Sequence, residues 1–103
     1  MKPKAILWTL PAKNDLVSVH DYIRLDNPEA ARRFSGSIRE AVSRLQDFPE
    51  MGSPLRGVPL QGEFRSIVVG NHRLIYRVDP KIIIIFRVWD CRQDPDKMWD
   101  ELS

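Results

Sequence analysis

The sequence predicts a two-layer α+β domain, in which two N-terminal helices pack on one face of a small, mainly antiparallel sheet. Two stretches lead to this prediction. Residues 12–48 show helical periodicity, and residues 63–90 hold three strand-like runs separated by tight-turn sequences. The expected order is strand, helix, helix, then three strands, and two amphipathic helices must cover one face of such a sheet. We expect residues 1–103 to form a single domain, because a chain of this length has room for one core.

The first strand is expected over residues 5–10, which read Ala-Ile-Leu-Trp-Thr-Leu. Pro11 ends this strand and suits the first turn of a helix. The first helix is expected over residues 12–26, because apolar side chains recur there at helical spacing. These side chains are Leu16, Val19 and Ile23.

The second helix is the clearest element in the sequence. Asn27 can cap its N-terminus, and Pro28 suits its first position. Six apolar residues form a continuous stripe along it, namely Ala31, Phe34, Ile38, Ala41, Val42 and Leu45. Pro49 ends the helix, and residues 49–62 contain three prolines and three glycines, which predicts a loop with little regular structure.

Three strands are expected over residues 63–69, 72–78 and 82–90. The sequences Gly70-Asn71 and Asp79-Pro80-Lys81 between them are typical of tight turns. We therefore expect these strands to form an antiparallel meander. The residues from Gln93 onward form an acidic tail.

Composition excludes several classes of protein. The chain has 16 Lys and Arg against 14 Asp and Glu, and a net charge of +2 is too close to neutral to require nucleic acid. A single cysteine, Cys91, excludes an internal disulfide framework and a cysteine-based zinc site, so we expect no metal and no cofactor. The longest apolar run, residues 82–86, is too short to span a bilayer, and no signal peptide is evident. A cytoplasmic protein without a membrane partner is the simplest expectation.

Strand alternation predicts a face that carries arginine, on the side of the sheet away from the helices. Arg65, Arg73, Arg77 and Arg87 are expected there, with Trp89 beside them. Such a surface suits phosphate, RNA or an acidic protein. A solvated face, common in antiparallel sheets, is the alternative.

The same alternation places Ile75, Ile83 and Ile85 on this arginine face. A surface that is half apolar and half arginine is unfavourable to leave bare, which suggests a partner segment with apolar and acidic residues. Alternatively, the loop at residues 49–62 packs on this face and completes a second core. Alternation along the strands leaves both possibilities open.

Polar residues also gather where strands begin and end. His72 could titrate near neutral pH. Asp90 and Arg92 lie at a strand end, a common place for sites, although a local ion pair is the simpler interpretation. Cys91 has no neighbouring histidine in the sequence that would make it a nucleophile.

Several short motifs follow one another in a characteristic order along the chain. They are Asn-Pro-Glu-Ala-Ala at 27–31, Phe-Pro at 48–49, His-Arg-Leu-Ile-Tyr-Arg-Val at 72–78, and Val-Trp-Asp-Cys-Arg at 88–92. From about residue 5 to residue 97, this ordered set resembles the RelE/ParE superfamily of toxins from type II toxin–antitoxin modules. The resemblance implies a RelE/ParE-like fold, a cognate antitoxin whose flexible segment wraps the toxin, and operator DNA bound through that antitoxin.

The resemblance also implies one of two targets. RelE-like members cleave mRNA in the ribosomal A site, whereas ParE-like members inhibit DNA gyrase. The helix-pair motif is closer to ParE-like members, so we expect a gyrase inhibitor, with a ribosome-dependent mRNA endonuclease as the alternative. For the antitoxin we expect contacts from Ile75, Arg77, Arg87 and Trp89.

For a nuclease, the resemblance assigns catalytic positions to three arginines. Arg73 matches the arginine that stabilises phosphate, Arg65 matches a basic position in the preceding strand, and Arg92 matches the arginine after the last strand. Asp90 stands where many members have histidine, and His72 is a weaker candidate. RNA cleavage also needs a base and an acid. Only Glu63 lies near the position of the base, and Met98 and Trp99 occupy the region that holds the acid in several nucleases.

Overall fold

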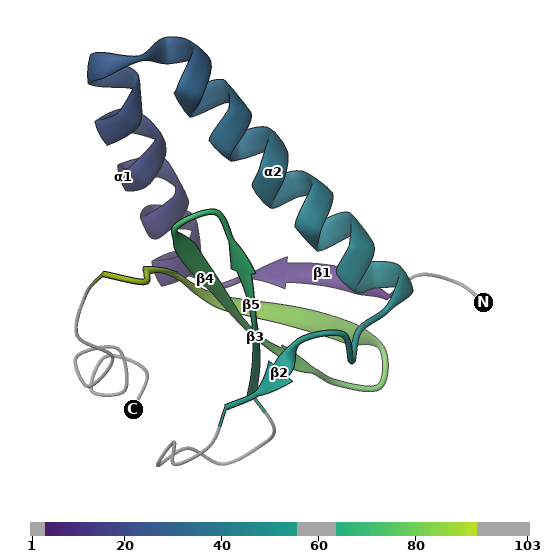
Figure 1. The fold of residues 1–103 in the computed structure, drawn as a ribbon. Coiled ribbons are helices and arrows are strands. Elements are labelled where there is room, and N and C mark those ends of the chain that lie inside the picture. The colour runs from purple at the N-terminus through teal and green to yellow at the C-terminus, as the bar shows by residue number, and fades with distance from the viewer. Residues whose placement is uncertain (1–3, 56–63, 93–103) are drawn as a thin grey trace.

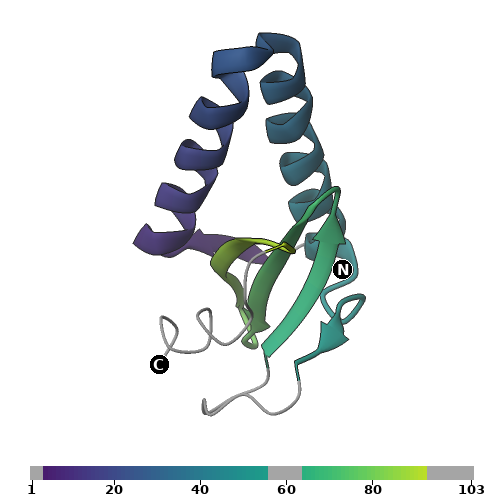
Figure 2. The ribbon, with the colours of Figure 1, turned by 60° about the vertical axis from the view of Figure 1, so that its left-hand side comes forward.

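The computed structural model describes residues 4–55 and 64–92. The elements follow in the order β1 (Ala5–Trp8), α1 (Leu10–Asp26), α2 (Pro28–Asp47), β2 (Ser53–Pro54), β3 (Phe64–Val69), β4 (His72–Val78) and β5 (Ile82–Asp90). Both helices stand on one side of the sheet, which confirms the predicted α+β class (Figure 1). They meet at their connection and spread apart toward the strands (Figure 2).

The sheet has the strand order β1-β5-β4-β3-β2. Strand β1 runs parallel to β5, and the other pairs are antiparallel, so the predicted meander of β3, β4 and β5 is confirmed. Gly70 has a φ of 62° in the turn between β3 and β4, a conformation that glycine adopts without steric cost. Within the described residues, no helix is long and apolar enough to cross a membrane.

Two boundaries differ from the sequence prediction. The first strand ends at Trp8, and Leu10 already belongs to α1, because the Thr9 side chain caps the helix by accepting a hydrogen bond from the Ala12 amide (3.2 Å). Residues 53–54, expected in a loop, form β2 against β3. Pro54 is tolerated there because β2 is an edge strand.

Helix α2 follows its sequence pattern closely. The Asn27 side chain accepts a hydrogen bond from the Ala30 amide (3.2 Å), as expected of an N-cap. Five of the six predicted stripe residues are buried, namely Ala31, Ile38, Ala41, Val42 and Leu45. Three of them, Ile38, Val42 and Leu45, pack in the core on the helix side of the sheet, where Leu74 and Tyr76 are fully buried.

A β-bulge in β5 overturns part of the predicted alternation. Tyr76 pairs with Ile85, whereas its neighbour Ile75 pairs with Arg87, so Phe86 is an extra residue in β5. Ile83 and Ile85 therefore pack in the core beneath the helices, and the prediction that they share a face with Ile75 was wrong. Beyond the bulge the phase of alternation is reversed, and Trp89 packs with Ile75 as expected.

Candidate functional site

One end of the sheet gathers five of the side chains that the sequence singled out. His72, at the start of β4, pairs in register with Asp90, at the end of β5. Two adjoining cavities of about 260 and 210 Å³ lie between this end of the sheet and α1. His72 and Arg92 line the first, Arg87 and Trp89 line the second, and Asp90 lines both. We call this region the α1–β5 groove.

Asp90 and Arg92 form the local ion pair that the sequence suggested. Arg92 Nη2 donates to Asp90 Oδ2 (2.8 Å), Arg92 Nε donates to Oδ1 (3.0 Å), and the Arg92 amide also donates to Oδ1 (2.8 Å). These hydrogen bonds lower the pKa of Asp90 to about 2, with the guanidinium contact as the largest cause. Asp90 is therefore ionised at neutral pH and has no proton to donate.

His72 is buried in the floor of the groove. Its ring meets the ring of Phe34 edge to face, with 5.1 Å between the centroids. Burial lowers the pKa of His72 below its ordinary value, which outweighs the opposite effect of the Asp90 charge. The imidazole is therefore neutral at neutral pH, and its packing against α2 limits its access to a ligand.

Arg87 is held by Asp15, a residue of α1 that the sequence analysis did not single out. Arg87 Nε donates to Asp15 Oδ2 (2.7 Å) and Nη2 donates to Oδ1 (2.8 Å), while Asp15 Oδ2 also accepts from the Val88 amide (3.0 Å). The Arg87 guanidinium lies 5.3 Å from the ring centroid of Trp89. Helical spacing alone could not reveal Asp15, because its partner lies 72 residues later.

Arg73 lies on the opposite side of the sheet, since it follows His72 directly in β4. It pairs with Trp89 on one side and with Val68 on the other. Arg73 Nη1 donates to Ser66 Oγ (2.8 Å), and no acidic residue of the described ranges pairs with it. Its guanidinium therefore keeps donors for an anionic ligand.

A second, smaller apolar cluster fills this face around Ile75, which is fully buried. Phe64 and Trp89 complete the buried cluster, and Leu55 and Phe86 pack against it. Leu55 belongs to the segment after α2, so this residue of the predicted loop packs against the cluster around Ile75. The Trp89 indole nitrogen is buried and has no hydrogen-bond partner among the described residues.

Arg77 ends this face near the turn between β4 and β5. Its guanidinium lies 5.6 Å from the ring centroid of Phe86, and Nη2 donates to Asp79 Oδ2 (3.3 Å). The Arg77 side chain thus already has contacts within the fold, but about 31% of its surface stays exposed.

Arg65 does not belong to the arginine face, contrary to the sequence prediction. It pairs in register with Tyr76, whose side chain lies in the core beneath the helices. Arg65 Nη1 donates to the carbonyls of Gly52 (2.8 Å) and Glu50 (3.3 Å). Alternation in this strand was too weak in the sequence to fix its phase, and the register against β4 decides it.

Within residues 4–55 and 64–92, no group of three or more His, Cys, Asp and Glu side chains could hold a metal ion. Glu63, Met98 and Trp99 lie outside the described residues.

Comparisons with known proteins agree with this fold. Residues 6–95 match the family model of the ParE toxin of the type II toxin–antitoxin system parDE. The putative toxin Y4kP of Sinorhizobium fredii is 41% identical over 56 residues, which cover 54% of this chain and 58% of that protein. The chain thus spans little more than half the length of this curated relative.

Two solved structures resemble the whole fold. A chain of the chromosomal ParDE system from P. aeruginosa has a TM-score of 0.69 and 27% identity, over 84% of this chain and 95% of that one. A chain of the toxin–antitoxin complex RelBE2 from Mycobacterium tuberculosis has a TM-score of 0.62 and 27% identity, over 85% of this chain and 98% of that one. Since the family model covers most of the sequence, the chain belongs to the ParE toxin family of type II toxin–antitoxin systems.

Proposed function

We propose that this chain is the toxin of a type II toxin–antitoxin module and that it acts by binding and inhibiting DNA gyrase. A cognate antitoxin neutralises it, and the pair binds operator DNA through the antitoxin. Membership of the ParE family and the likeness to the ParDE structure support the toxin assignment.

The observation that carries the choice of target is the separation of Arg73 from the titratable groups. RNA cleavage without a metal needs a cation, a base and an acid around one phosphodiester. Arg73 lies on the sheet face away from the helices, whereas His72, Asp90 and Arg92 line the α1–β5 groove on the helix side. This separation favours an inhibitor that binds its target over a nuclease that cuts RNA.

The protonation states of the groove residues also favour a binding inhibitor over a nuclease. Asp90 is an ionised carboxylate with a pKa of about 2, so it is a weak base and has no proton to give. His72 is neutral but buried against Phe34. A binding inhibitor needs neither group to transfer a proton.

For the antitoxin, we propose a contact with the surface around Arg73 and Arg77, with the buried Trp89 beneath it. Val68 lies beside Arg73 and is 60% exposed, so this surface combines a cation with an apolar side chain. An antitoxin segment with acidic and apolar residues would complement it. Ile75 and Arg87, which we also expected to touch the antitoxin, are buried or paired and would support this surface from beneath.

The decisive experiment compares two targets with the same purified protein. One reaction contains DNA gyrase and relaxed plasmid, and the other contains programmed ribosomes with a defined mRNA. Loss of supercoiling with intact mRNA supports the proposal, whereas cut mRNA with unaffected gyrase contradicts it and establishes the ribosome-dependent endonuclease.

Variants at matched positions test the role of the arginine surface. Arg73→Glu and Arg77→Glu should each weaken antitoxin binding by about tenfold or more, whereas Arg39→Glu, on the exposed side of α2, should change it by less than about twofold. Equal affinities of all three variants would remove this surface from the antitoxin interface. Arg73→Ala, if folded and fully toxic, would show that Arg73 is not needed for toxicity.

A further inference from the structure

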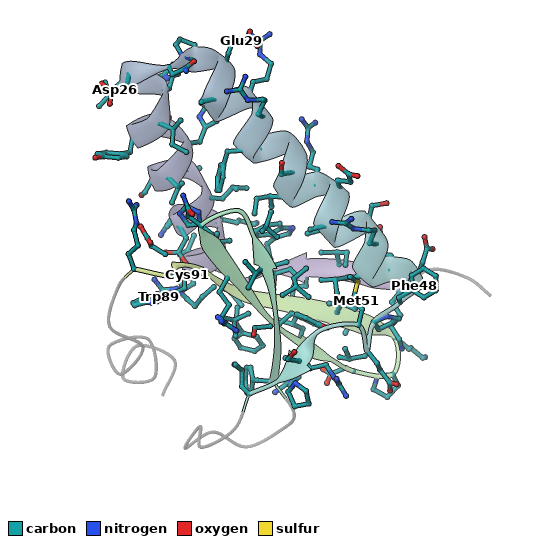
Figure 3. The ribbon with its side chains drawn as sticks, viewed as in Figure 1. Asp26, Glu29, Phe48, Met51, Trp89 and Cys91 are labelled. Atoms are coloured by element: carbon teal, nitrogen blue, oxygen red, sulfur yellow. The ribbon has the colours of Figure 1, made fainter. Side chains whose placement is uncertain are left out.

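At the opposite end of the sheet from the α1–β5 groove, a cavity of about 840 Å³ opens between the C-terminus of α2 and the turn that joins β4 to β5. Its apolar lining comes from Phe48, Pro49, Met51, Val78 and Pro80. Figure 3 shows Phe48 and Met51 together on this side of the molecule, far from Trp89 and Cys91. We call this cavity the α2-end groove.

Two large apolar side chains stand open to solvent at the groove. Phe48 is 67% exposed and Met51 is 48% exposed. The two residues lie three positions apart in one turn. The Met51 amide donates to the Phe48 carbonyl (3.1 Å), which keeps the two residues on the same bend of the chain. Adjacent exposed apolar side chains that line a concave surface are typical of a binding site.

Hydrogen bonds behind the groove hold the backbone of one wall in place. The buried Gly52 amide donates to the Tyr76 hydroxyl (2.9 Å), which in turn donates to the Pro49 carbonyl (2.8 Å). Arg65 binds the Gly52 carbonyl (2.8 Å) from the other side. Only glycine fits at position 52, because a Cβ there would lie 2.8 Å from Tyr76 Cε1. A wall fixed in this way needs little ordering when a partner binds.

The rim of the groove is acidic, in a chain whose net charge is +2. Asp47, Glu50 and Asp79 line it together with one cation, Lys4. Lys4 Nζ donates to the carbonyls of Asp79 (3.1 Å) and Pro80 (2.6 Å). Asp79 pairs with Arg77, whereas Asp47 and Glu50 have no ion-pair partner among the described residues. The two unpaired carboxylates therefore favour a ligand with basic side chains.

We propose that the α2-end groove binds a segment of the antitoxin that carries one or two large apolar side chains flanked by lysine or arginine. This inference rests on the proposed function, because it takes the antitoxin as the partner. Asp79 lines the groove and also pairs with Arg77 at the edge of the arginine surface, so the two surfaces meet at this residue. One antitoxin segment can therefore contact both, with its acidic residues on the arginine surface and its basic residues in the groove.

A second copy of this chain fits the groove less well. A two-fold contact would place one groove against the other, because such an interface uses the same patch on both subunits. The carboxylates of Asp47 and Glu50 would then face their own copies, and like charges would repel.

The test measures binding of the protein encoded by the neighbouring gene to this chain and to variants of the groove. Met51→Glu should weaken binding by about tenfold or more, because it places a charge on the apolar wall beside Glu50. The double variant Asp47→Lys/Glu50→Lys should weaken it by about tenfold, because it repels the basic side chains. Its control, Asp26→Lys/Glu40→Lys, carries the same change of charge on exposed parts of the helices and should alter binding by less than about twofold.

The possible outcomes separate this inference from the proposed function. If the parent chain and all variants bind equally well, the groove is not part of the interface and the inference is wrong, while the toxin–antitoxin assignment stands. If the parent chain itself does not bind, the assignment of the antitoxin as partner is wrong, and so is the inference that rests on it. Sedimentation supplies a further check, because a dimer of the parent chain that Met51→Glu dissociates would show that a second copy occupies the groove. The circular dichroism spectrum and the urea midpoint of each variant should match those of the parent chain, which shows that the variant is folded.

Discussion

The two helices lie over the same sheet but are held there by different forces. Helix α2 buries five apolar side chains, whereas Ala12 is the only fully buried residue of α1. Large apolar residues of α1 are instead exposed, namely Leu10, Val17, Tyr22 and Leu25. Helix α2 therefore forms the framework with the sheet, and α1 needs other contacts.

A polar contact supplies much of what α1 lacks in apolar burial. Asp15 binds Arg87 through two hydrogen bonds and also accepts from the Val88 amide, directly after the bulge of β5. Both side chains are largely buried, at 16% and 14% exposure. The comparison teaches that one helix can be placed mainly by burial along its length, whereas its neighbour combines less burial with a specific ion pair. Four predictions test this difference, from the largest effect to the smallest.

Truncation of the α2 stripe should have the largest effect. Leu45 is fully buried in the core, so Leu45→Ala should lower the free energy of unfolding by about 2–5 kcal/mol. Val17→Ala on the exposed side of α1 should change it by less than about 0.5 kcal/mol. Urea denaturation measures both values. Similar losses for the two variants would show that α1 and α2 are not held differently.

Loss of the Asp15–Arg87 ion pair should come next. Asp15→Asn keeps the size of the side chain but removes its charge, and we expect a loss of about 1.5–3 kcal/mol because a charged, largely buried hydrogen bond is weakened. Asp21→Asn is the matched control on the same helix, since Asp21 is exposed and its contacts with His20 and Arg24 are long. If both variants are equally stable in urea, the ion pair does not hold α1 in place.

The pH dependence of His72 sharpens the comparison, because His72 packs against Phe34 of α2 and lines a cavity with Tyr22 of α1. Its pKa in the folded chain lies below its ordinary value of 6.5, so the unfolded chain binds a proton more readily. Stability should therefore fall as the pH drops below about 6.5. The difference in urea midpoint between about pH 7.5 and about pH 5.5 should shrink in His72→Gln. An unchanged difference in this variant would contradict the role of His72.

The Asp90–Arg92 ion pair should have the smallest effect, because Arg92 is exposed. The pKa of Asp90 is lowered to about 2, so its contribution is present above the ordinary value of 3.8 and is lost as the pH falls toward 2. An NMR titration of the Asp90 carboxyl should give a midpoint near 2, and Arg92→Ala should move it upward. A midpoint near 3.8 in the parent chain would show that the ion pair is not formed in solution.

Much of the architecture followed from local patterns. The stripe of α2, the cap at Asn27 and the tight turn at Gly70 depend on side chains that are neighbours in the sequence, and all three were predicted correctly. The ion pair of Asp90 and Arg92 was also foreseen, since the two residues are two positions apart. Such features can be predicted from the sequence because the interacting residues lie within a few positions of each other.

Long-range pairing decided what the pattern could not show. The phase of β5 depends on the bulge at Phe86, and an unbroken run of isoleucines gives no signal of an extra residue. Arg65 was assigned to the wrong face because its position depends on the register with Tyr76. Asp15 and Arg87 form an ion pair although they are 72 positions apart, so neither residue can be predicted from the sequence around the other.

By itself, therefore, the sequence determined the α+β class, the helix pair, the antiparallel meander and the resemblance to RelE/ParE toxins, since periodicity, caps and turns are encoded locally. The tertiary structure alone decided which arginines share a surface. It placed Arg73 on one face of the sheet, His72, Asp90 and Arg92 in the groove on the other, and Arg65 behind the α2-end groove. The physical reason is that a one-residue change in strand register moves every following side chain to the opposite face.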